Sequence, residues 1–134
     1  MTFGKSRYDK SIEWELLRFA TKAGCTVVGG ASKLLKHFER ENSPKSVISY
    51  CDRRWNTGNS YLTMGFTKKH TSSPSYHYTI DGVTIFNRVK FQKHKLKKVL
   101  KIYDETKTEA QNMADNGYYR IWDCGTTVFV KTYD

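Results

Sequence analysis

The sequence has few of the residues that build disulfide frameworks, zinc clusters or membrane spans. Its 134 residues include three isolated cysteines and two prolines. Because the cysteines are scattered and odd in number, we expect neither a disulfide framework nor a clustered zinc site, and we expect a reducing cytoplasm as the location. No apolar run reaches the roughly 18 residues of a membrane span. The first ten residues lack an apolar segment, so a secretory signal is not expected either.

Acidic residues are also in short supply, and the shortage is uneven along the chain. Lys and Arg number 23 against 13 Asp and Glu, which gives a net charge of +10. Residues 86–101 have a net charge of +7 with no carboxylate, whereas residues 1–85 carry +6 and residues 102–134 carry −3. Such a block is either a solvated lysine-rich helix or a surface for an anionic partner. The surplus argues against mimicry of nucleic acid and favours a polyanionic partner.

The apolar and glycine patterns predict one α/β (α+β) domain over residues 1–134. We expect a flexible end at residues 1–10, a core over 11–86, and a basic helix, a capped helix and a terminal hairpin over 87–134. The expected helices lie at residues 11–23, 32–40, 88–101 and 106–117. The expected strands lie at residues 25–28, 46–52, 75–80, 83–86, 118–123 and 127–131, with a polar loop at 67–74. Thr106 and Glu109 have the spacing of a capping box for the last helix.

The expected helix at residues 88–101 is amphipathic. Its buried side carries Val89, Leu96, Val99 and Leu100. Its opposite side carries a stripe of lysines at Lys90, Lys93, Lys97 and Lys101.

The first half of the chain contains two short motifs, a glycine turn and a tyrosine motif. Residues 27–32 (VVGGAS) predict a strand, a glycine turn and a helix start, whose backbone N–H groups can bind a phosphate. Tyr61 begins the motif Y-x-x-x-G-F at residues 61–66. Over residues 25–86 these motifs resemble the C-terminal half of the GNAT acyltransferase fold. The resemblance implies that Tyr61 protonates a departing thiolate and that acetyl-CoA binds through its pyrophosphate to Gly29, Gly30, Ala31 and Ser32.

A second resemblance covers more of the chain, roughly residues 14–130. It is carried by GGASKLLKHF (29–38), ISYCDRRW (48–55), SPSYHY (73–78), NRVKFQKHKL (87–96) and GYYRIWDCG (117–125). These strings resemble a C-terminal region of phage homing endonucleases of the Vsr-like type and of related short phage proteins. Residues 49–54 (SYCDRR), with the glycine turn, also resemble the Mom branch of DNA-modification proteins. The resemblance implies a DNA-targeting module without a cutting domain. We expect no cofactor for such a module and a location in the host cell cytoplasm, where it acts either alone or beside a separately encoded nuclease.

The residue types agree with a nucleic-acid partner, either DNA or RNA, and the phosphate-binding candidates are cations. They are Arg53, Arg54, Lys68, Lys69, Arg88, Lys90, Lys93, Lys97 and Lys101. Trp55, Tyr76 and Tyr78 are candidates for stacking on bases, whereas Trp14, Trp122 and Phe91 are expected in the core. A phage inhibitor of a host nucleic-acid-dependent defence complex is a further alternative with the same surface chemistry.

Intrinsic nuclease activity is not expected. A metal-dependent nuclease needs carboxylates or histidines at ligand spacing. The available groups do not show such spacing on a helix: Asp52, Asp81, Asp123, His70, His77 and His94. Asp81 is better explained by the Asp81-Gly82 turn of a hairpin. The sequence therefore predicts no metal site.

Overall fold

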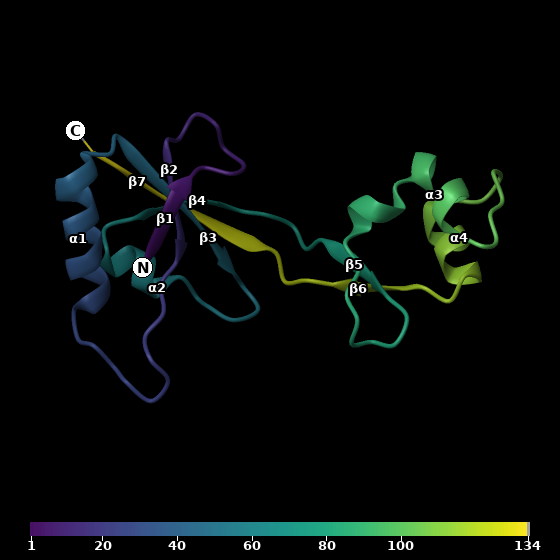
Figure 1. The fold of residues 1–134 in the computed structure, drawn as a ribbon, viewed down its shortest axis with the longest axis horizontal. Coiled ribbons are helices and arrows are strands. Elements are labelled where there is room, and N and C mark those ends of the chain that lie inside the picture. Colours follow the sequence, from purple (N-terminus) through teal and green to yellow (C-terminus); the bar gives the residue numbers. More distant parts are fainter. Residues whose placement is uncertain (134) are drawn as a thin grey trace. The chain divides into compact units, whose positions relative to one another are not determined.

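The structure is a computed structural model that describes residues 1–133. Over these residues the architecture is mixed α+β, with a five-stranded sheet, a two-stranded sheet, four α-helices and one 3₁₀ helix (Figure 1). The chain forms two compact units. Unit 1 comprises Met1–Ser73 and the residues from Gly125 onward, and unit 2 comprises Pro74–Cys124. No helix within the described chain has the length and apolarity that crossing a membrane requires.

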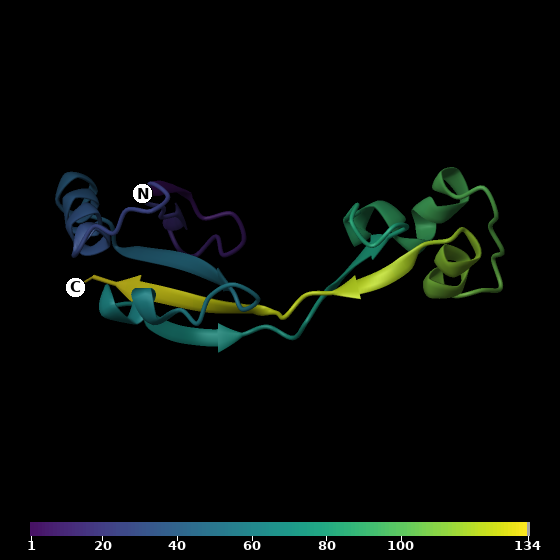
Figure 2. The same cartoon turned by 90° about the horizontal axis from the view of Figure 1, so that it is seen from below.

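Unit 1 is built on the five-stranded sheet, in the order β1-β2-β3-β7-β4. The strands are β1 (Thr2–Lys5), β2 (Trp14–Arg18), β3 (Ser46–Asp52), β4 (Thr67–Thr71) and β7 (Thr126–Thr132). Strands β2 and β3 are parallel, and the other neighbours are antiparallel. Figure 2 shows β7 between β3 and β4.

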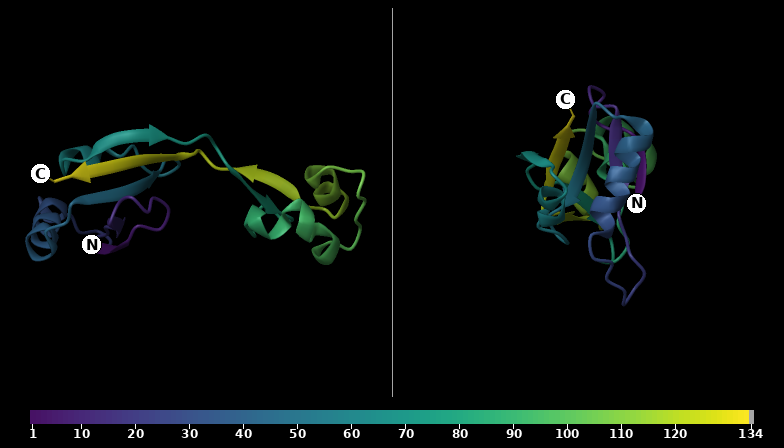
Figure 3. Two further views of the ribbon diagram at one scale, coloured as in Figure 1. Left: turned by 90° about the horizontal axis from the view of Figure 1, so that it is seen from above. Right: turned by 90° about the vertical axis from the view of Figure 1, so that its left-hand side faces the viewer.

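One face of this sheet is covered by helix α1 (Gly30–Asn42), as the right-hand view of Figure 3 shows, with the short helix α2 (Asn59–Thr63) in the same layer. Strand β3 was correctly predicted from its apolar run. Val47 and Cys51 contact the helix side, whereas Ile48 packs in a smaller cluster with Ile12 and Val128 on the opposite side. A strand that is buried on both faces has few polar positions, which explains the run.

The prediction for the first 28 residues was wrong. Residues 14–18 form a strand instead of a helix, residues 25–28 lie outside the strands, and residues 2–5 form strand β1 rather than a flexible end. Trp14 and Leu16 pack against the core, and Glu15 between them is buried on the other face with Arg7 as its partner. This alternation has a period of two, which defines a strand.

The expected terminal hairpin was also wrong, although both of its strands exist. Strand β6 (Tyr119–Trp122) pairs with β5 (Tyr76–Thr79) in unit 2, whereas β7 pairs with β3 and β4 in unit 1. The chain changes sheet at Gly125, which has a φ of 75° and lies so close to the Ser72 carbonyl that a Cβ would collide with it. Residues 67–71, expected in a loop, form β4, which supplies the edge of the larger sheet.

Unit 2 packs its two-stranded sheet against 3₁₀ helix η1 (Arg88–Phe91), α3 (Lys93–Val99) and α4 (Glu109–Asp115). The core contains Tyr78, Phe91, Leu96, Leu100 and Met113. The expected continuous helix over residues 88–101 is interrupted at Gln92, which has an extended backbone. Five residues of unbroken helix rotate a side chain by about 500°, so positions 91 and 96 would point in different directions. The break lets both residues enter the core, and it leaves Val89 and Val99 exposed, contrary to the prediction.

Helix α4 starts later than the sequence suggested. Thr108, rather than Thr106, caps it, and Gln111 completes the capping box by accepting from the Thr108 backbone N–H. Glu109 is thereby placed in the first turn, where the helix dipole favours a carboxylate.

Candidate nucleic-acid interface

The basic segment of unit 2 is exposed and poorly neutralised. Within residues 1–133, four of its lysines have neither an ion pair nor a side-chain hydrogen bond: Lys90, Lys93, Lys98 and Lys101. Lys97 differs, because its Nζ lies 3.3 Å from Glu105 Oε1. Lys95 donates to the Val89 carbonyl oxygen at 3.2 Å, which ties α3 to η1. Since the segment is divided between η1, α3 and the following turn, the predicted four-lysine stripe on one helix face is not formed.

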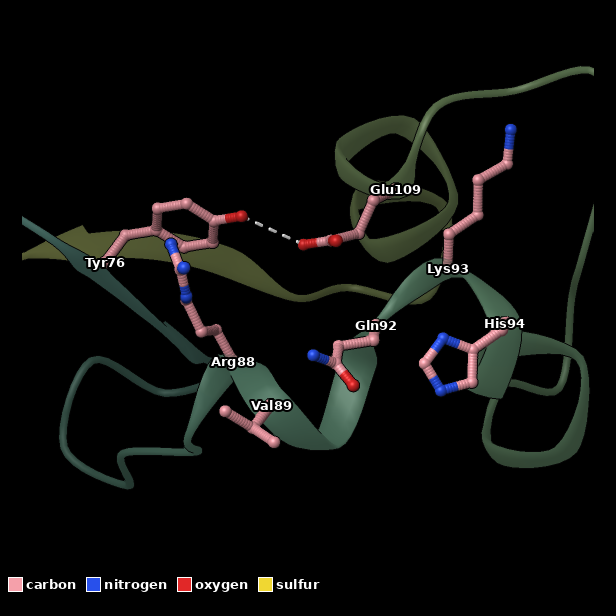
Figure 4. Close-up of a pocket in the computed structure, with 7 residues that line it drawn as sticks. All are labelled: Tyr76, Arg88, Val89, Gln92, Lys93, His94 and Glu109. Atoms are coloured by element: carbon pink, nitrogen blue, oxygen red, sulfur yellow. Dashed lines mark hydrogen bonds between the residues drawn. The ribbon is translucent and has the colours of Figure 1, made fainter. Parts of the chain in front are cut away.

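A polar pocket of about 380 Å³ lies beside this segment in unit 2 (Figure 4). Its lining residues come from β5, η1, the start of α3 and α4: Tyr76, Arg88, Val89, Gln92, Lys93, His94 and Glu109. Arg88, Lys93 and the imidazole of His94 provide donors, and Glu109 provides the only carboxylate among these lining residues. The lining can therefore bind an anionic ligand that also offers a hydrogen-bond donor.

Glu109 organises the floor of this pocket. Its Oε1 accepts hydrogen bonds from the hydroxyl groups of Tyr76 at 3.1 Å and Tyr78 at 2.8 Å. Burial raises the pKa of Tyr78 to about 12; the bond from Arg120 opposes this shift and the bond to Glu109 adds to it. Both tyrosines thus act as donors, and the Tyr76 ring is held in one orientation.

The structure separates the three predicted stacking residues. Tyr78 is buried in the core of unit 2, so its ring is not available to a base, and that prediction was wrong. Tyr76 is half-buried, with guanidinium carbons over its ring at 5.2 Å for Arg88 and 4.2 Å for Arg120. Trp55 is 72% exposed and carries the guanidinium of Arg54 at 4.9 Å from its ring centroid.

Sequence reasoning missed an aromatic residue that the structure exposes. Trp122 was expected in the core, but it is 58% exposed on β6. Of the other two expected core aromatics, Phe91 is buried and Trp14 is half-buried against the core of unit 1. Trp122 lies directly opposite Tyr76 in the antiparallel ladder, with ring centroids 5.1 Å apart. The Tyr-x-Tyr alternation of β5 was visible in the sequence, but its pairing with β6 was not.

Unit 1 carries the other predicted cations. Arg53 and Arg54 follow β3 in an exposed turn, in which the Asp52 carboxylate accepts from the Arg54 backbone N–H at 2.8 Å. On β4, Lys68 is exposed, whereas Lys69 is paired with Asp9 at 3.0 Å. Asp52 thus shapes the turn that presents Arg54 and Trp55.

The glycine turn is present, although the strand before it is not. Gly29 has a φ of 70° and is the N-cap of α1. Its carbonyl oxygen accepts a hydrogen bond from the backbone N–H of Lys33 in the first turn of the helix. A pocket of about 420 Å³ lies in front of this helix start, and its lining includes Gly29, Gly30, Ala31 and Ser32. Tyr61 is not among the lining residues, because its ring stacks on Phe129 in the core at 5.0 Å.

The predicted metal candidates are not brought together. The part of the chain that the structure describes contains no group of three or more histidine, cysteine or acidic side chains arranged to hold a metal ion. Asp81 is engaged in its own turn, where it accepts from the hydroxyl and backbone N–H of Thr84, and these bonds lower its pKa.

Comparison with known proteins adds no relative. No protein-family model, curated protein or solved structure matches this chain.

Proposed function

We propose that this chain is a DNA-binding protein of phage or mobile-element type, which binds DNA mainly through backbone phosphates and does not cut it. The observation that supports the proposal is the group of exposed, unpaired lysines at residues 90–101 of unit 2. Four cations concentrated in one short segment repel one another, and a phosphate chain relieves that repulsion while releasing its condensed counterions.

The turn after β3 in unit 1 offers a second set of contacts. Arg54 and Trp55 form an exposed cation–π pair there, so a guanidinium and an indole are presented together. A phosphate can bind the guanidinium while a base or sugar contacts the indole. Each unit therefore carries cations that can bind phosphates, and unit 1 carries the larger share of the net charge at +7 against +3 for unit 2.

The proposal is tested by a salt titration of binding to random duplex DNA, single-stranded DNA and RNA. We expect log K to fall linearly with log salt concentration, by about 0.9 per phosphate contact on duplex DNA. If the protein binds none of these three nucleic acids at low salt, the result contradicts a nucleic-acid function. Tight binding with no salt dependence would contradict recognition through phosphates.

Acyl-CoA-dependent N-acyl transfer is the second candidate function, and the pocket at the start of α1 is the observation that favours it. Backbone N–H groups at a helix start can bind a pyrophosphate, and two glycines allow close approach. Tyr61 stacks on Phe129 and is not among the residues that line this pocket, so a proton donor within the pocket lining would be another group. Calorimetry with acetyl-CoA distinguishes this candidate, since no heat of binding at high micromolar ligand eliminates it.

A further inference from the structure

We propose that unit 2 holds an unpaired nucleotide, with its base stacked on Trp122 and its phosphate at the rim of the pocket formed by Arg88, Lys93 and His94. This inference rests on the proposed function and deepens it, because it names single-stranded nucleic acid as the preferred ligand. None of the comparisons or sequence motifs assigns a role to Trp122.

One face of the two-stranded sheet carries aromatic and cationic side chains together. Tyr76 pairs with Trp122 and Tyr78 pairs with Arg120, so these four side chains project from the same face. Tyr78 is buried in the core of unit 2, which leaves the half-buried Tyr76 and the exposed Trp122 as the aromatic surface of this face. Aromatic side chains beside cations on the exposed part of a sheet are of the type on which unstacked bases bind.

Contacts within unit 2 hold these aromatic rings in place in the absence of a ligand. The Tyr76 hydroxyl is held by Glu109, and its ring is flanked by the guanidinium groups of Arg88 and Arg120. Trp122 contacts the edge of this ring at an interplanar angle of 61°. A ligand that stacks on the indole therefore pays little entropy to order the protein side of the contact.

The charge and the size of the pocket in unit 2 suit an anionic ligand. The pocket beside Tyr76 has a volume of about 380 Å³, which lies within the range of roughly 300–1,000 Å³ typical of small-molecule sites. Its two formal cations outnumber its one carboxylate, and that carboxylate already accepts two hydroxyl hydrogen bonds. An anion is consequently favoured at the rim, whereas Gln92 and the remaining oxygen of Glu109 can accept hydrogen bonds from donors of the ligand.

The duplex form of nucleic acid fits this arrangement poorly. In a duplex both faces of each base are covered by neighbouring base pairs, so an indole can reach a base face only after unstacking. A single strand presents its bases without that cost. This aromatic surface should therefore favour single strands, while the lysines at residues 90–101 contact phosphates of either form.

The test uses a single strand of about 12 nucleotides with one 2-aminopurine, which loses fluorescence when stacked, and the same strand annealed to its complement. We expect Trp122→Leu to lower the affinity for the single strand about ten-fold or more and to abolish the protein-dependent quenching. We expect the affinity for the duplex to change by less than about two-fold, since phosphate contacts remain.

Two control variants make the result specific. Tyr119 lies on the same strand and is 63% exposed, but it is paired with Thr79 and projects from the opposite face, so Tyr119→Leu should leave single-strand binding unchanged. Trp122→Phe keeps an aromatic ring and should restore quenching and most of the affinity, which excludes loss of folding as the cause of the Leu effect.

The outcomes separate the two proposals. If wild-type protein binds neither probe, the proposed function fails and this inference falls with it. If wild-type protein binds both probes in a salt-dependent way, but Trp122→Leu leaves single-strand affinity and quenching unchanged, the inference is overturned while the proposed function stands. Equal losses for Trp122→Leu and Tyr119→Leu also overturn it.

Discussion

Replacing Lys90, Lys93 and Lys98 together by Gln removes three of the four unpaired lysines of unit 2 without disturbing an ion pair. Glutamine has nearly the helix propensity of lysine, so α3 and η1 should persist. If each lysine contacts one phosphate, the slope of log K against log salt becomes shallower by about 2.7 on duplex DNA. Between 50 mM and 200 mM salt, wild-type protein then loses about 40-fold more affinity than the variant.

The assay is fluorescence anisotropy with a labelled random duplex at several salt concentrations. Lys33, Lys36 and Lys45 are exposed lysines of unit 1, so their joint replacement by Gln is the matched control with the same change in net charge. Because these three lysines are not part of the proposed interface, the control should keep the wild-type slope. An unchanged slope in the unit 2 variant, or an equal change in the control, refutes the assignment of these lysines to phosphate contacts.

Three further predictions concern the elements that hold these surfaces. Arg7→Ala leaves the buried carboxylate of Glu15 without its guanidinium, so the free energy of unfolding should fall by about 2–3 kcal/mol, less than for a pair buried on both sides. Burial alone would raise the pKa of Glu15, but the hydrogen bonds and charge of Arg7 outweigh it and lower the pKa below 4.5. Wild-type protein therefore loses this stabilisation only as the pH falls below that value, and the stability of the variant should depend less on acid. Urea titrations at about pH 7 and about pH 3 measure the stability of each protein. Equal stabilities of wild type and variant at neutral pH would contradict the ion-pair argument. Gly58 has a φ of 87° and a Cβ there would overlap the Phe129 ring, so Gly58→Ala should cost about 2–4 kcal/mol in urea unfolding. Gly24→Ala, with a φ of 75° and open space, should cost only about 1–2 kcal/mol, and equal losses would contradict the packing argument. Thr108→Ala should lower the free energy of unfolding by about 1 kcal/mol through loss of the α4 cap, as measured by thermal unfolding. An equal loss for Thr106→Ala, whose hydroxyl bonds to Asp104, would contradict the assignment of Thr108 as the cap.

The elements that could be predicted from the sequence are those with local signals. Strand β3 is an apolar run that begins soon after Pro44, and α1 follows the turn at Gly29 and carries Leu35 and Phe38 at helical spacing. Strand β2 could not be predicted in this way, because Ile12 and Leu16 fit a helix as well as Trp14 and Leu16 fit a strand. Its pairing with β1 and β3 decided the outcome, and such partners are not visible in a local pattern.

The candidate site was predictable in its charges and not in its aromatic residues. The excess of lysine at residues 86–101 required only counting, and the structure leaves most of these side chains exposed. Whether Tyr78 or Trp122 is available to a ligand depends on the ladder between β5 and β6 and on the hydroxyl bonds to Glu109. Both are long-range features, so the sequence favoured a buried Trp122 and an accessible Tyr78, and each was wrong.

The central claim is that phosphates of DNA bind the unpaired lysines of unit 2. It is tested most directly by following the amide signals of ¹⁵N-labelled protein in NMR spectra during titration with a random duplex. We expect the largest shifts at residues 88–101, with smaller shifts around Arg54 and Trp55, and little change along α1. Shifts confined to α1 and the glycine turn, or no shifts at DNA concentrations that saturate the anisotropy assay, would contradict the claim.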